Sequence, residues 1–107
     1  MILFIITMNA LQEKQKEILQ TLISVLETAE NERGNLSYSI FSDIEDSNVF
    51  SLISEWDNRH DLNRHMRSDR FSVLLGTKSL LSEPLKIQIF TVAASEGTQA
   101  VADVRKK

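Results

Sequence analysis

The sequence contains no cysteine, which excludes disulfide bonds, thiolate nucleophiles, cysteine-ligated zinc and iron–sulfur clusters. Its three glycines are too few for a dinucleotide-binding fingerprint, and no glycine-rich phosphate loop occurs. The G-x-S-x-G nucleophile elbow and the H-E-x-x-H metal motif are also missing. These absences argue against NAD-dependent enzymes and against the hydrolases that depend on those motifs.

The chain also lacks a basic surface and a long apolar run. Its formal net charge is −3, with acidic and basic residues interspersed. Because no basic stripe is available to hold a phosphate backbone, we expect no nucleic acid partner. The apolar stretch Met1–Met8 is far too short to cross a bilayer and shows no features of a secretory signal. We therefore expect a cytoplasmic protein with no membrane partner.

The composition is that of an ordinary globular protein. Of the 107 residues, 42% are apolar and 25% are charged, which is enough hydrophobicity to support a folded core. A chain of this length forms one domain, because two halves would each be marginal in stability. We predict a domain over residues 1–93. The polar tail 94–107, with Val101 and Val104 as its apolar anchors, is predicted to be mobile or weakly docked.

Hydrophobic periodicity and polar caps predict the elements of that domain. In chain order they begin with an apolar strand over 1–8 and a long helix from Leu11 to about Asn31, capped by Asn9. Two strands follow over 36–43 and 49–56, and in the first of them Leu36, Tyr38 and Ile40 alternate with serines, which predicts one apolar face. A helical connection in two parts comes next: a helix through about Arg67, capped by Asp57 or Asn58, and a second helix before Pro84, capped by Ser68 or Asp69. The last strand covers 85–93.

The predicted order β-α-β-β-α-β indicates an α+β, ferredoxin-like fold. This topology forms a four-stranded antiparallel sheet with the helices on one face. The strands over 1–8 and 49–56 carry apolar residues on both faces, so the second face of the sheet should also be covered. A contiguous apolar sheet face usually marks an interface, and we expect a homodimer whose two sheets pack face to face.

Trp56 ends the predicted strand 49–56, and His65 follows nine residues later on a predicted helix. A helix folded back over the strand end would bring an aromatic wall and a titratable imidazole together, as in a small pocket. Asp61, one turn before His65, is placed to orient the ring, and His65 would then suit a general base. Two structural interpretations stay open: Trp56 as core filling, and His65 as a buried ring bonded to a carbonyl.

Three further observations complete the candidate site. Tyr38 can add a phenol hydroxyl from the second strand, although a strand tyrosine usually serves packing. His60 and His65 are five residues apart, about 140° around a helix, so they cannot share a metal ion. We therefore propose no metal site.

Glu55-Trp56, His65 with Met66-Arg67-Ser68, Phe71 and the element order together resemble the antibiotic biosynthesis monooxygenase (ABM) family, in its quinol-monooxygenase-like branch. The resemblance covers about residues 1–93. It implies a dimeric α/β barrel with a pocket between helices and sheet. For some members it also implies oxygenation of polycyclic phenols without metal or flavin.

Residue by residue, Trp56 stands where polyketide-oxidising members have a tryptophan tied to catalysis. Those members carry an asparagine and a tyrosine where this chain has Leu52 and Leu62, and many relatives have a second histidine where this chain has Arg70. Haem-degrading relatives place an iron-ligating histidine where this chain has Leu75, so the resemblance disfavours haem chemistry.

The leading functional hypothesis is a cofactor-independent monooxygenase that oxidises a phenolic or quinol-type small molecule with O2. We assign His65 as the base and Trp56 as the catalytic pocket wall, with substrate contacts from Tyr38, Leu52, Leu62 and Phe71. The alternatives are a non-catalytic dimeric module that binds a small ligand or assists a stress response, and an isomerase or lyase using the same base.

Overall fold

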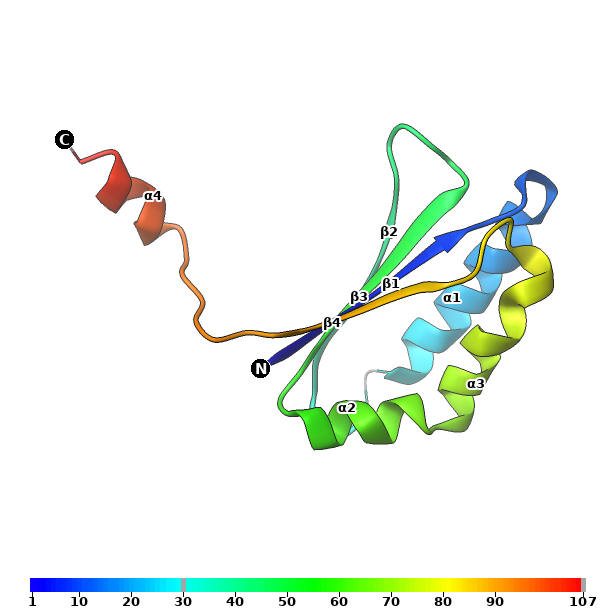
Figure 1. The fold of residues 1–107 in the computed structure, drawn as a ribbon, viewed down its shortest axis with the longest axis horizontal. Coiled ribbons are helices and arrows are strands. Elements are labelled where there is room, and N and C mark those ends of the chain that lie inside the picture. The colour runs from blue at the N-terminus through cyan, green and yellow to red at the C-terminus, as the bar shows by residue number, and fades with distance from the viewer. Residues whose placement is uncertain (30, 107) are drawn as a thin grey trace.

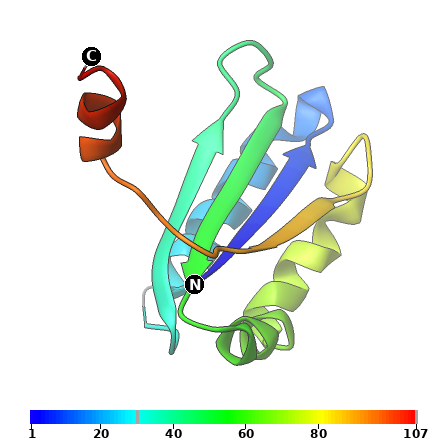
Figure 2. The ribbon, with the colours of Figure 1, turned by 60° about the vertical axis from the view of Figure 1, so that its left-hand side comes forward.

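A single antiparallel sheet forms the centre of the protein in the computed structural model, which describes residues 1–29 and 31–106. The strands lie side by side in the order β2-β3-β1-β4 (Figure 2). Their bounds are β1 Ile2–Asn9, β2 Asn35–Ser42, β3 Val49–Trp56 and β4 Lys86–Thr91. This arrangement confirms the predicted ferredoxin-like fold.

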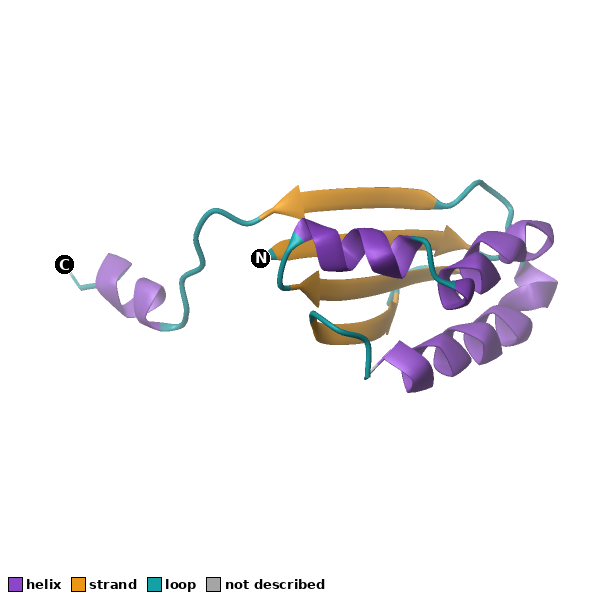
Figure 3. Cartoon of the chain, turned by 90° about the horizontal axis from the view of Figure 1, so that it is seen from below, coloured by secondary structure: helices purple, strands orange, loops and turns teal. Residues whose placement is uncertain are grey.

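Three α-helices cover one side of this sheet and leave the other side bare (Figure 1). They are α1 (Gln15–Ala29), α2 (Arg59–Met66) and α3 (Asp69–Leu75), with the short 3-10 turns η1 (Gln12–Lys14) before α1 and η2 (Gly76–Leu80) after α3. Figure 3, seen from below, shows α2 in front of the sheet, running along the direction of the strands. The predicted layers are therefore present.

The two-part helical connection begins where its polar caps predict. Asn58 accepts a hydrogen bond from the backbone N–H of Asp61 at the start of α2, and Ser68 accepts one from Phe71 at the start of α3. Each cap satisfies a backbone donor that the first helical turn leaves unpaired. These caps fix where α2 begins, and so where His65 is held over the sheet.

The predicted cap of the first helix is wrong. Asn9 belongs to β1, and its carbonyl accepts hydrogen bonds from the backbone N–H and hydroxyl of Ser82. Because its backbone is extended and bonded to the chain before β4, Asn9 does not cap a helix. The helical segment begins after Leu11, first as η1 and then as α1.

Alternation along the central strands separates the core from the bare face. The core side is lined by Ile2, Phe4, Ile6 and Met8 of β1 and by Phe50, Leu52, Ser54 and Trp56 of β3, all buried. Their neighbours on the opposite face are only half-buried in the single chain. Both faces of the sheet were expected to be buried. Within the single chain, only the face covered by the helices is buried.

The second strand differs from its predicted alternation at one position. The register of β2 against β3 shifts between Asn35 and Ser37, and Leu36 at this bulge is 57% exposed. Tyr38 lies opposite Ser54 and Ile40 opposite Leu52, and both are partly buried against the core. Leu36 therefore does not share their face, because a bulge inserts one residue and breaks the two-residue period.

The chain after β4 leaves the body of the domain and ends in a short helix, α4 (Gln99–Val104), which stands apart in Figures 1 and 3. Val101 and Val104 are exposed on it. The division at residue 93 into domain and tail stays a prediction. No helix among the described residues is both long and apolar enough to cross a bilayer.

Candidate active site

His65 lies inside an aromatic enclosure between α2 and the sheet. Its ring stacks on Trp56, with centroids 4.6 Å apart and planes inclined by 30°. Phe71 and Tyr38 present edge-on contacts at 5.5 Å and 5.8 Å between ring centroids, and Phe4 lies at 6.3 Å. The His65 side chain is 0% exposed. The convergence expected from the spacing of Trp56 and His65 is present in the structure.

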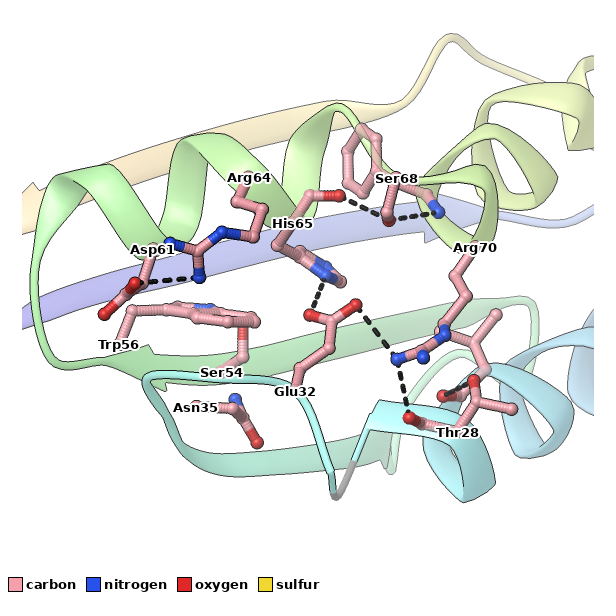
Figure 4. Close-up of polar contacts among 12 residues, drawn as sticks. Thr28, Glu32, Asn35, Ser54, Trp56, Asp61, Arg64, His65, Ser68 and Arg70 are labelled. Carbon is pink, nitrogen blue, oxygen red and sulfur yellow. Dashed lines mark hydrogen bonds and ion pairs between the residues drawn. The ribbon is translucent and has the colours of Figure 1, made fainter.

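The Trp56 side chain is hydrogen-bonded to a residue of its own strand, β3. Its indole N–H donates a hydrogen bond to the Ser54 hydroxyl over 2.9 Å, and both residues are buried (Figure 4). The two side chains lie on one face of β3 because they are two residues apart. The flat face of the indole is thereby fixed against the His65 ring.

The carboxylate that contacts His65 comes from Glu32, in the turn between α1 and β2, and not from Asp61. One Glu32 carboxylate oxygen lies 2.5 Å from Nδ1 of His65, and the other lies 3.1 Å from Arg70 (Figure 4). Arg70 also donates to the Thr28 carbonyl over 2.7 Å. His65, Glu32 and Arg70 thus form a chain of polar contacts from the core to the surface.

The role expected for Asp61 is wrong because its carboxylate serves the start of α2. It accepts hydrogen bonds from Asn58 and from Arg64, each over 3.0 Å. The spacing of one helical turn between Asp61 and His65 is as predicted, but the carboxylate is already bonded elsewhere. Sequence reasoning missed Glu32, since nothing local connects residues 33 positions apart.

Two buried polar atoms at this site have no hydrogen-bond partner among the described residues: Nε2 of His65 and the hydroxyl of Tyr38. Burial lowers the pKa of His65 below its ordinary 6.5, against the opposing effect of Glu32, so the ring is neutral at pH 7. Burial also raises the pKa of Tyr38, so its hydroxyl stays protonated. The site therefore offers a free base at Nε2 of His65 and a free donor at the Tyr38 hydroxyl. Buried polar groups without a hydrogen-bond partner are rare in proteins.

A polar cavity of about 340 Å³ opens beside this enclosure. It is lined by Glu32, Arg33, Asp61, Arg64, His65, Ser68, Asp69 and Arg70. Trp56, Tyr38 and Phe71 are not among its lining residues, and Leu52 and Leu62 lie in the fully buried core. The structure thus brings Trp56, His65, Tyr38 and Phe71 together, in a closed arrangement.

A larger cavity of about 620 Å³ lies between η2 and β4 and is lined largely by apolar residues from Leu75 to Ile87, without His65. Size alone would favour this cavity, but it contains none of the unpartnered polar atoms. Nor do any three carboxylates or imidazoles among the described residues cluster as a metal site. The chemistry is concentrated around His65.

The sequence model of the antibiotic biosynthesis monooxygenase family matches residues 1–74. The chain belongs to this family. Glu32, Tyr38, Trp56, His65 and Phe71 all fall within the matched part of this ABM protein, whereas the larger cavity is lined by residues that follow it.

Two related proteins are similar in sequence to this chain. The chain is 28% identical over 76 residues to the "Putative monooxygenase YcnE" of Bacillus subtilis, an alignment that covers 70% of this chain and 80% of YcnE. It is 27% identical over 85 residues to the uncharacterized Synechocystis protein sll1783, and this alignment covers 78% of this chain but only 58% of sll1783. This ABM chain thus spans little more than half the length of the Synechocystis relative.

The fold is shared with solved structures. The crystal structure of a "putative antibiotic biosynthesis monooxygenase" from Deinococcus radiodurans superposes with a TM-score of 0.83 at 21% identity, covering 91% of this chain and 97% of that one. At this identity the likeness shows the ABM fold alone.

Proposed function

We propose that this ABM protein is a monooxygenase that oxidises a phenolic or quinol-type small molecule with O2, using His65 as the base and no cofactor. The observation that carries the proposal is the unpartnered Nε2 of His65 beside the unpartnered Tyr38 hydroxyl, inside an aromatic enclosure. A phenol complements both atoms: its O–H can donate to Nε2, and its oxygen can accept from Tyr38.

Proton removal starts the proposed reaction. When Nε2 accepts the phenol proton, the substrate becomes an electron-rich anion, and the Tyr38 hydroxyl stabilises the charge on its oxygen. The anion passes an electron to O2, and the resulting radicals combine at a ring carbon to give a peroxide anion, which takes the proton from Nε2 and becomes a hydroperoxide. The hydrogen on that ring carbon then leaves as a proton to Nε2 while the O–O bond breaks. The inner oxygen stays on the ring as a carbonyl, and the outer oxygen leaves as hydroxide and takes the proton from Nε2 to form water.

The oxidation balances without an outside reductant. Replacing hydrogen by oxygen at one ring carbon of a quinol releases two electrons, and conversion of the quinol into a quinone releases two more. These four electrons reduce O2 fully: one oxygen atom stays in the product as a hydroxyl group and the other leaves as water. The protein supplies the base, the orientation and a site closed to solvent.

Substrate can reach Nε2 only when the enclosure opens, because the His65 side chain is 0% exposed. The ring is covered by α2 and α3, which are joined at Arg67-Ser68. Movement of such a short helical pair away from the sheet is the kind of gating step that admits substrate in many enzymes.

The first prediction concerns His65. Wild-type protein is expected to accelerate O2 uptake by a member of a panel of dihydroxynaphthalenes and anthrones, without added metal or flavin. His65→Ala should reduce the rate about a hundredfold, because a positioned base contributes at least this factor. An oxygen electrode measures both rates, with product identity checked by mass spectrometry.

His60→Ala is the matched control, since His60 is exposed and lies on the same helix. It should keep the wild-type rate. The wild-type rate should also fall with acid only below pH 6.5, because burial lowers the pKa of the base and it must be neutral to act. Equal O2 uptake with wild type and His65→Ala across the panel would end the proposal.

The complete burial of His65 supports a second candidate, a non-catalytic module that binds a small aromatic ligand. Trp56 is the only tryptophan, so its fluorescence reports directly on the enclosure. Ligand-dependent quenching without O2 uptake, unchanged in His65→Ala, would favour the module over the enzyme.

We also propose that the bare sheet face joins two copies of the chain. Phe41 and Phe90 on this face are 52% and 43% exposed, and Leu3, Ile5 and Ile53 lie between them on the central strands. A patch of this kind on an isolated chain is the usual mark of an interface. A second copy would cover it with an identical apolar surface, as two-fold dimers do.

The second prediction tests this face. Sedimentation should give twice the 12.2 kDa chain mass for wild type. Phe41→Glu should raise the dimer dissociation constant about a hundredfold, the effect of losing an interface hot spot. Val73→Glu is the control, because Val73 is 53% exposed on α3, away from the sheet. A monomeric wild type, or equal effects of the two variants, would contradict the prediction.

A further inference from the structure

From the geometry around His65 we infer that Glu32, held by Arg70, is a positioning residue that keeps the His65 proton on Nδ1 and so leaves Nε2 free as the base. This inference deepens the proposed function and rests on it for its catalytic meaning. The state of the ring itself can be measured independently of any activity.

The backbone of Glu32 is fixed from both sides. Its N–H donates to the carbonyl of Ala29 over 3.0 Å, and its carbonyl accepts from the N–H of Asn35 over 3.1 Å. These bonds tie Glu32 to the last residue of α1 and the first residue of β2. The carboxylate is thereby delivered to His65 by two anchored elements, despite its place in a turn.

The carboxylate determines which ring nitrogen carries the proton. A carboxylate can only accept hydrogen bonds, so the contact from Nδ1 of His65 to Glu32 requires an N–H at Nδ1. In a neutral imidazole the other nitrogen then has a free lone pair. This matches the observed lack of a partner at the buried Nε2.

Arg70 determines how the carboxylate is oriented. Its guanidinium bonds the second oxygen of Glu32 over 3.1 Å and the Thr28 carbonyl over 2.7 Å, so the two oxygens of Glu32 have separate partners. Arg70 therefore orients the carboxylate without touching the ring. With Arg70 in place, the oxygen that faces His65 stays available as an acceptor.

The other charged groups near the ring are engaged elsewhere or lie further out. Asp61 and Arg64 of α2 pair with one another over 3.0 Å, and the Tyr38 hydroxyl from β2 stays protonated. Arg33 of the turn and Asp69 of α3 line the polar cavity. Of the described charged side chains, Glu32 is the one hydrogen-bonded to the imidazole.

A glutamine at position 32 separates this role from simple packing. Glutamine has one carbonyl oxygen and one NH2 group in place of two acceptors. Arg70 can only donate, so it should claim the oxygen and turn the NH2 group toward His65. The ring would then have to accept at Nδ1, which moves its proton to Nε2 and removes the base.

The experiment is nitrogen NMR of histidine-labelled protein. With His60 and His65 as the two histidines, His60→Gln assigns the spectrum. Wild type should show a protonated, pyrrole-type Nδ1 and a pyridine-type Nε2 at His65. Glu32→Gln should reverse the two types and lower kcat about a hundredfold with KM unchanged, the contribution of a general base.

A double variant, Glu32→Gln with Arg70→Met, provides the rescue. Without Arg70 the glutamine oxygen is free to face His65, so the proton should return to Nδ1 and the rate should recover in part. Asp61→Asn is the matched control and should leave the His65 spectrum unchanged. If some variant does not fold, the wild-type spectrum alone still decides the proton position.

The outcomes separate the two proposals. A proton on Nε2 in wild type, or an unchanged tautomer in folded Glu32→Gln, would overturn the role of Glu32. The predicted tautomers together with no O2 uptake on any substrate would support the role of Glu32 and overturn the monooxygenase proposal.

Discussion

Replacing Trp56 by alanine is expected to lower the free energy of unfolding by about 3 to 5 kcal/mol, as for other buried tryptophans. Trp56 is 0% exposed and is the largest fully buried side chain. Its removal leaves a cavity under the His65 ring and leaves the buried Ser54 hydroxyl without the indole donor. Urea unfolding at a fixed protein concentration measures the loss, because the proposed dimer would make stability depend on concentration.

Two variants show which part of the side chain matters. Trp56→Phe keeps a ring against His65 but loses the N–H bonded to Ser54, so it should cost about 1 to 3 kcal/mol. Leu36→Ala, at the exposed bulge, should change stability by about 0.5 kcal/mol or less. If Trp56→Ala lowered the free energy of unfolding by no more than Leu36→Ala does, the indole would not be a core side chain.

The secondary structure was predictable wherever the signal was local. The β3 bounds Val49–Trp56 coincide with the predicted strand, and the Asn58 and Ser68 caps start α2 and α3 as expected. Each of these signals comes from residues that are close together in the sequence. Asn9 misled because its carbonyl is bonded to Ser82, a contact across the fold that no local pattern contains.

The site was predictable in part for the same reason. The meeting of Trp56 and His65 follows from a strand end, a short connection and a helix that must return over the sheet. The alternation of β2 places Tyr38 on the same side, opposite Ser54. Glu32 could not be found in this way, since it reaches His65 from a turn on a different element.

The assignment of Asp61 shows the limit of reasoning from helix spacing. A residue one turn before His65 shares its helix face, but spacing does not reveal competing partners. Asp61 sits in the first turn of α2, where Asn58 and Arg64 bond its carboxylate. Arg70 is the converse case: helix spacing gives it no link to His65, yet it pairs with the carboxylate that contacts His65.

Replacing Gly34 by alanine is expected to cost about 2 to 5 kcal/mol. Gly34 has a φ of +81°, and this left-handed conformation costs about 1 to 2 kcal/mol for a residue with a Cβ. An added Cβ would also overlap the Asp61 side chain, which is buried. Displacing that carboxylate breaks its bonds to Asn58 and Arg64, and an unpaired buried group adds about 1 to 3 kcal/mol.

The loss should extend to the site, because Gly34 also accepts a hydrogen bond from the N–H of Asp57 over 2.8 Å, just before α2. Moving the start of α2 moves His65 away from Glu32. Gly34→Ala should therefore disturb the His65 nitrogen signals even below the unfolding transition. Gly76→Ala is the control: with φ −75° and nothing within 4 Å of the added Cβ, it should leave stability unchanged or raise it by about 0.4 to 1 kcal/mol. Equal unfolding midpoints for the two alanine variants would mean that the contact between Gly34 and Asp61 does not hold α2 in place.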